Sequence, residues 1–202
     1  MFWAIYGGTL FASLAMMVRE GLWSNTITLV NIVISGLVAF GFYAPLTIWL
    51  DEMTGGSNTY WLDFVIIWAL FLVTMIICQV LTKLASGTRL RFKNPIDPVG
   101  GPLVGLIAAW VLAAFVTATL HTSPMPPDAF GGKLIHDDSE VASASALMCP
   151  DLGWLRFVEH MSQGSAFGSP STTGFSAKAF VQIYEHHRDK YKSGGGLRVS
   201  RH

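Results

Sequence analysis

Residues 26–50, TITLVNIVISGLVAFGFYAPLTIWL, contain no charged side chain. Crossing about 30 Å of hydrocarbon takes about 20 apolar residues in a helix, so a run of this length predicts a transmembrane helix. In lipid an isolated segment must satisfy its backbone hydrogen bonds internally, and the helix is the conformation that does so. This run therefore places the chain among the integral membrane proteins.

Three similar runs surround it, which we expect to form further membrane-spanning helices over residues 1–18, about 60–84 and 99–120. Of all residues 51% are hydrophobic and 13% charged, and the mean hydropathy is +0.47, which is too apolar for a soluble domain of this size. The predicted fold class is all-α. We expect a polytopic membrane protein with a four-helix transmembrane bundle at residues 1–120 and a small, helical, extramembrane tail at 121–202.

The connections between these runs differ in charge, and the difference predicts an orientation. Basic residues in short loops mark the cytoplasmic side. The second connection carries Asp51 and Glu52 and no basic residue, whereas basic residues stand in the first and third connections: Arg19, Lys83, Arg89, Arg91 and Lys93. We therefore expect both termini on the periplasmic side of a bacterial inner membrane.

The tail contains two segments with aromatic residues at helical spacing. One follows Pro150-Asp151 and the other follows Ser176, and each predicts an amphipathic helix. A third, short helix is expected over residues 140–148, and disorder from about residue 193. The aromatic side chains are the expected surface for a partner in the tail: Trp154, Phe157, Phe180 and Tyr184.

Small and polar residues inside the spans suggest where helices meet. Gly100, Gly101 and Gly105 give the fourth span a small-xxx-small face that allows close approach of another helix. Asn31 and Asp63 are polar residues within apolar runs, so they should point into the bundle or toward an interface. The same five residues could instead line a path through the membrane. Asn25 is expected to cap the second helix.

Other function classes find little support in the sequence. The net charge is zero, which gives no electrostatic basis for nucleic-acid binding. No metal-ligand spacing or nucleophile motif is present, so we expect no enzyme activity, no cofactor and no metal. The expected partners are the lipid bilayer and an envelope protein or a second copy of the chain. Arg89, Arg91 and Lys93 form a basic cluster suited to anionic lipid head groups, besides fixing the topology.

Several of these features together resemble the colicin V production (CvpA) family of bacterial inner-membrane proteins. They are the hinge Arg19-Glu20-Gly21, the glycine-bearing second span, and FKNPID at 92–97 leading into GGPLVG at 100–105. The resemblance covers about residues 1–125. Members of the family often carry an acidic residue in the first span, which is lacking here, so no role of such a residue is transferred.

The resemblance implies a non-enzymatic membrane anchor or scaffold that serves toxin production or export, or the maintenance of the cell envelope. The alternative function is a small transporter or channel, with its path along the glycine-rich fourth span.

Overall fold

The structure is a computed structural model, and it describes residues 1–54, 59–85, 96–125, 130, 149–163 and 175–192. All elements within these residues are helical, which confirms the all-α prediction for the described part of the chain. They are α1 (Phe2–Met17), α2 (Leu22–Thr54), α3 (Thr59–Ala85), α4 (Ile96–Thr119), the short 3-10 helix η1 (Leu120–Thr122), α6 (Pro150–Gln163) and α7 (Ala177–Lys192).

Three of these helices are long and apolar enough to cross a membrane: α2, α3 and α4. Helix α1 is equally apolar but has 16 residues, which is shorter than the usual span. The structure thus supports a polytopic membrane protein, and the predicted count of four spans is not confirmed. In α2 the helix continues through Asp51 and Glu52, because a helix can keep its backbone hydrogen bonds after it leaves the hydrocarbon.

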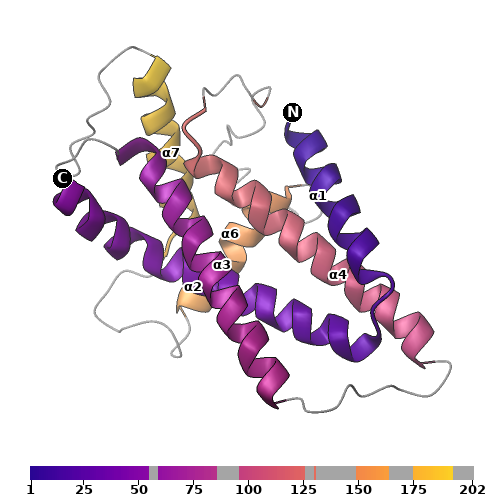
Figure 1. The fold of residues 1–202 in the computed structure, drawn as a ribbon. Coiled ribbons are helices and arrows are strands. Elements are labelled where there is room, and N and C mark those ends of the chain that lie inside the picture. The colour runs from indigo at the N-terminus through magenta and orange to yellow at the C-terminus, as the bar shows by residue number, and fades with distance from the viewer. Residues whose placement is uncertain (55–58, 86–95, 126–129, 131–148, 164–174, 193–202) are drawn as a thin grey trace.

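Helix α2 packs against both α3 and α4, and α1 packs along α4 (Figure 1). The two ends of α1 show that it runs antiparallel to α4. Met17 lies beside Gly105 in the first half of α4, while Phe2 packs with Leu120 directly after the end of α4. The N-terminus and the residues that follow α4 consequently lie at the same end of the molecule.

The outer face of α3 is covered with large apolar side chains. They are more than half exposed in the isolated chain, an arrangement that is unfavourable in water and favourable against lipid acyl chains. These residues are Leu72, Val73, Ile76, Ile77, Leu81 and Leu84.

Helices α6 and α7 share one hydrophobic core with α2, α3 and α4. The rings of Trp154 and Phe180 pack among the rings of Phe40 and Phe115 from the spans. The two predicted tail helices are therefore present, and they are seated on the bundle. The division at residue 120 into two domains stays a prediction, and the proposed helix over 140–148 and the disorder from 193 lie outside the described residues.

Candidate functional site

The indole of Trp154 lies directly over Gly36, in the middle of α2. A Cβ atom at Gly36 would overlap Cζ2 of Trp154, so only glycine leaves room for the ring. Trp154 is 4% exposed, and its ring meets that of Phe115 edge to face with centroids 5.6 Å apart. Burial of a large aromatic ring at such a fitted position is a major source of packing energy. Gly36 and Trp154 therefore fix helix α6 on the bundle.

Helix α7 is tied to α3 by a buried hydrogen bond. The hydroxyl of Tyr184 donates to Oδ2 of Asp63 over 2.7 Å, and both residues are buried. Burial, and after it the charges of Tyr43 and Asp63, raise the pKa of the Tyr184 phenol well above 10.0. The phenol is thus neutral and remains a donor at every physiological pH. Asp63 thus points inward as predicted, and its hydrogen-bond partner, Tyr184, belongs to the tail.

A second buried pair joins the residues after α4 to the first turn of α6. Nε2 of His121, in η1, lies 3.0 Å from Oδ2 of Asp151, and the two side chains are 0% and 1% exposed. Asp151 also stands at the N-terminal end of α6, where the helix dipole favours a carboxylate. Removing one member of a buried pair leaves the other poorly compensated, so this contact fixes the start of α6.

We call the opposite end of α2 and α4 the hinge end; it comprises Arg19–Gly21 and the α4 residues that face them. A Cβ atom at Gly101 would lie 2.9 Å from the carbonyl oxygen of Glu20, and one at Gly105 would lie 3.3 Å from Cβ of Met17. The backbone of α4 and that of the hinge are therefore in close contact. The predicted packing role of this glycine face has a definite partner, the connection between α1 and α2.

Asn25 and Asp97 supply the hydrogen bonds of the hinge end. The amide nitrogen of Asn25 donates to the carbonyl oxygens of Gly101 at 2.7 Å and Met17 at 3.0 Å. Asp97, in the first turn of α4, accepts from the backbone N–H of Leu22 at 2.8 Å. The prediction that Asn25 caps α2 is therefore wrong: α2 begins at Leu22 because Asp97 accepts its first N–H.

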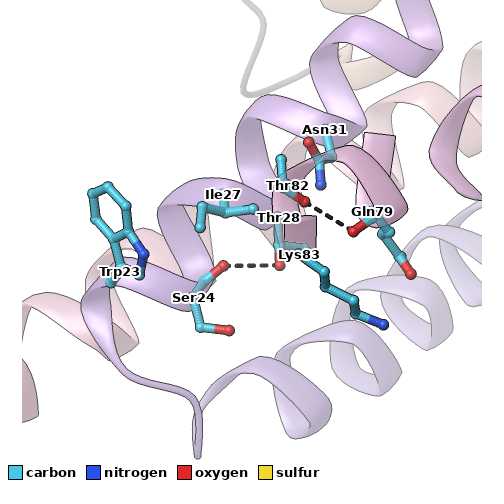
Figure 2. A pocket seen from close by; sticks show the side chains of 8 residues that line it. All are labelled: Trp23, Ser24, Ile27, Thr28, Asn31, Gln79, Thr82 and Lys83. Atoms are coloured by element: carbon cyan, nitrogen blue, oxygen red, sulfur yellow. Dashed lines mark hydrogen bonds between the residues drawn. The ribbon is translucent and has the colours of Figure 1, made fainter. Parts of the chain in front are cut away.

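A polar cavity of about 240 Å³ lies between the first turns of α2 and the last turns of α3. Figure 2 shows Asn31 at one edge of it and the ammonium group of Lys83 at another. Asn31 is 3% exposed, as expected for a polar residue in a span. The cavity is lined by Trp23, Ser24, Ile27, Thr28, Asn31, Gln79, Thr82 and Lys83.

The structure does not bring the predicted path residues together. Asp63 stands near the start of α3, while Gln79, which shares the cavity with Asn31, is about 24 Å further along the same helix. The glycine face of α4 is covered by the hinge. The basic cluster Arg89, Arg91 and Lys93 lies outside the described residues.

The four predicted partner residues of the tail have two different placements. Trp154, Phe180 and Tyr184 are buried against the bundle of the same chain, and Phe157 is 36% exposed. The sequence reasoning missed His121, Asp151 and the receiving position Gly36. An Asp in the first turn of a predicted helix is a usable signal for Asp151, whereas nothing local distinguishes Gly36 from Gly41.

The fold, the glycine contacts at the hinge end and the apolar spans can now be set beside known proteins. A model of the colicin V production protein family matches residues 4–146. The chain belongs to this family. It is a membrane protein that its family links to colicin V production, and that family is not a known enzyme family. No curated protein and no solved structure matches the chain.

Within this colicin V production family protein, the match covers α1 to α4 and ends before α6 begins. The hinge end lies wholly inside the matched part. The contacts of Trp154 and Tyr184 join residues outside the match to residues inside it.

Proposed function

We propose that this colicin V production family protein is a non-enzymatic scaffold of the bacterial inner membrane, serving colicin V production and export or envelope maintenance. The observation that supports it is the seating of α6 and α7 on the spans, through Trp154 over Gly36 and Tyr184 on Asp63. Two buried titratable groups of the tail are engaged in internal contacts, Tyr184 with Asp63 and Asp151 with His121. A tail held in this way presents a fixed outer surface, which suits a binding platform.

The outer face of α7 is the surface that we assign to an envelope partner or a second copy of the chain. While Phe180 and Tyr184 face the bundle, the opposite side of the helix is exposed, and Ile183 on it is 52% exposed. Protein interfaces have an apolar centre and a polar rim, and Ile183 with the polar side chains on the same face could supply both. The exposed residues of this face are Lys178, Ala179, Gln182, Ile183 and His186.

The scaffold proposal is tested in cells that depend on this protein to export colicin V. We expect Ile183→Glu to lower toxin export while the amount of membrane-inserted protein stays at the wild-type level, because the change is confined to the outer face. Lys178→Glu, at the edge of the same face, is the milder companion, and Leu72→Ala on the lipid face of α3 is the control. Wild-type export by the Ile183→Glu variant would contradict the proposal.

In the topology that we propose for this function, α1 also crosses the membrane and is the fourth span. At 1.5 Å per residue its 16 residues cover about 24 Å, and no charged residue occurs before Arg19. A transmembrane helix shorter than the hydrocarbon can be accommodated by local thinning of the bilayer. With four spans and basic residues at the hinge end, the N-terminus and the tail are periplasmic.

This topology is tested by labelling single cysteines in a variant without Cys78 and Cys149. Glu20→Cys reports on the hinge end, and Met125→Cys reports on the end from which the tail departs; both native side chains are exposed. A membrane-impermeant maleimide added to intact spheroplasts should label the second site and not the first. The reverse pattern would overturn the orientation, and labelling of both sites would contradict the three spans that lie between them. A cysteine placed directly after Met1 reports on α1: it should be labelled, and its protection would overturn the assignment of α1 as a span.

A further inference from the structure

The cavity between α2 and α3 contains hydrogen-bond donors that the protein itself does not use. Only 3% of the Asn31 surface is exposed, yet its amide makes no hydrogen bond with any residue that the structure describes. Asn25, two turns earlier on the same helix, donates to three backbone carbonyls. A buried amide without a partner is unfavourable, and more so inside a membrane bundle. The amide of Asn31 is therefore suited to a partner from outside the chain.

The lining contains both engaged and unengaged donors. The engaged ones are the hydroxyls of Thr28 and Thr82, which donate to carbonyls of their own helices at 2.9 Å and 2.8 Å. The side chains of Ser24, Asn31, Gln79 and Lys83 make no side-chain hydrogen bond within the described part of the chain. Four donors thus surround the cavity: the Ser24 hydroxyl, the amides of Asn31 and Gln79, and the Lys83 ammonium.

The charge of the lining selects an anion. Among the described residues that line the cavity, Lys83 is the only charged one, and it forms no ion pair with a described residue. None of these described lining residues is a carboxylate. Several neutral donors and one ammonium group around a cavity of about 240 Å³ suit a phosphate group, whose oxygens only accept hydrogen bonds when ionised.

The position of the cavity indicates a lipid as the source of that phosphate. Lys83 stands in the last turn of α3, where the apolar helix ends and the head-group level of a bilayer begins. Directly before it, the outer face of α3 carries Ile76, Ile77 and Val80, which would lie along acyl chains. Trp23, at the rim, is of the residue type enriched at this level.

We propose that this cavity binds the phosphate of an anionic phospholipid, with Lys83 as the charge partner and the Asn31 amide as the innermost donor. Binding by this site is independent of the seating of the tail, which occupies other faces of α2 and α3. The proposal therefore extends the scaffold function by a specific lipid contact.

The test uses the full chain in detergent micelles, with phosphatidylglycerol titrated in and retained lipid counted by native mass spectrometry. Phosphatidylcholine and inorganic phosphate are titrated in parallel. We expect Asn31→Leu to weaken phosphatidylglycerol binding about tenfold, as for loss of a hydrogen bond to a charged group. Lys83→Gln should weaken it about fivefold. Arg19→Gln, which removes an exposed cation outside the cavity, should leave binding unchanged.

Asn31→Leu has a second expected effect that separates a binding role from a structural one. Without phosphatidylglycerol the variant should be at least as heat-stable as the wild type, because an unpaired buried amide has been replaced by an apolar group of similar size. A loss of stability together with unchanged lipid binding would show that Asn31 serves packing only, and it would overturn the proposal.

Three further outcomes would overturn it. Equal weakening by Arg19→Gln and Lys83→Gln would mean that lipid retention follows general surface charge. If inorganic phosphate stabilised the chain against heat as strongly as phosphatidylglycerol does, the cavity would be a site for a soluble anion. Equal retention of phosphatidylcholine would show a lipid site without selection for negative charge.

Discussion

At the hinge end α4 contacts the connection between α1 and α2 through glycine. At the other end of α4, around Phe115, where α6 is seated, it is surrounded by aromatic rings; we call this the tail end. Gly101 and Gly105 bring backbones into contact, and Asn25 and Asp97 link them by hydrogen bonds. Around Phe115, by contrast, the space between helices is filled by side chains from four elements.

The difference shows two ways to hold helices together where lipid gives no hydrophobic driving force. The hinge end uses close backbone approach at glycines and short polar contacts, whose geometry tolerates little added volume. The tail end uses a large ring delivered by a distant segment, and its strength lies in buried volume. Variants at the two ends should therefore fail for opposite reasons.

The largest effect is expected at the tail end. Trp154→Ala would empty the position over Gly36 and lower the free energy of unfolding by about 3–5 kcal/mol, the range for buried Trp or Phe truncation. Chemical unfolding in micelles measures it. Phe157 lies about one helical turn after Trp154 and is 36% exposed. Phe157→Ala is therefore the control, and it should lower the free energy of unfolding much less. Equal losses would show that α6 is not fixed through Trp154.

At the hinge end an added methyl group should be the harmful change. Gly101→Ala would place a carbon 2.9 Å from the Glu20 carbonyl oxygen, and we expect a loss of about 1–3 kcal/mol through overpacking. Gly41→Ala is the matched variant, since a Cβ there meets nothing within 4 Å. It should be neutral or slightly stabilising. If both variants behave alike, close approach at the hinge end has no energetic role.

Tyr184→Phe removes the hydrogen bond to Asp63 and should cost about 1–2 kcal/mol. It should also change the response to pH. Because the folded chain keeps the phenol protonated, the unfolded state releases its proton first, and wild-type stability should fall above about pH 10. Below that pH the residue adds no pH dependence. Unfolding measured from neutral pH to above pH 10 should show a smaller decline in the variant; an identical decline would exclude Tyr184 as its source.

The smallest effect is expected from Asn25→Leu, which deletes the donor shared by the hinge carbonyls. Interhelical hydrogen bonds in membranes contribute about 0.6 kcal/mol on average, so a loss of about 0.5–1.5 kcal/mol is expected. Thr28→Val, which removes a hydroxyl bonded within its own helix, should have no measurable effect. A larger loss than for Gly101→Ala would mean that polar contacts, rather than close approach, hold the hinge end.

The spans were predictable because the bilayer imposes a length and an apolar composition on any chain that crosses it. The run at residues 26–50 lies inside α2 (Leu22–Thr54), and its earlier start depends on a contact with Asp97. Periodicity also predicted α6 and α7 behind Pro150 and Ser176. Apart from the start of α2, each of these features is set by neighbours in sequence.

The contacts between distant segments were not predictable in this way. The aromatic spacing around Trp154 shows that α6 has an apolar face, and it does not say which surface covers that face. A helix face that binds a partner protein and one that packs into a groove of the bundle show the same aromatic spacing, because both surroundings are apolar. Likewise the glycines of α4 predict close packing and leave the partner open, because a hinge backbone and a helix backbone require equally little space.

The position of Trp154 over Gly36 also imposes an order in time. Synthesis proceeds from the N-terminus, so α2 and α4 are made before the ribosome reaches α6. During that interval the surface around Gly36 lacks its ring, and the nascent bundle is incomplete. Completion of this part of the bundle therefore waits for α6, after α2 and α4 have been made.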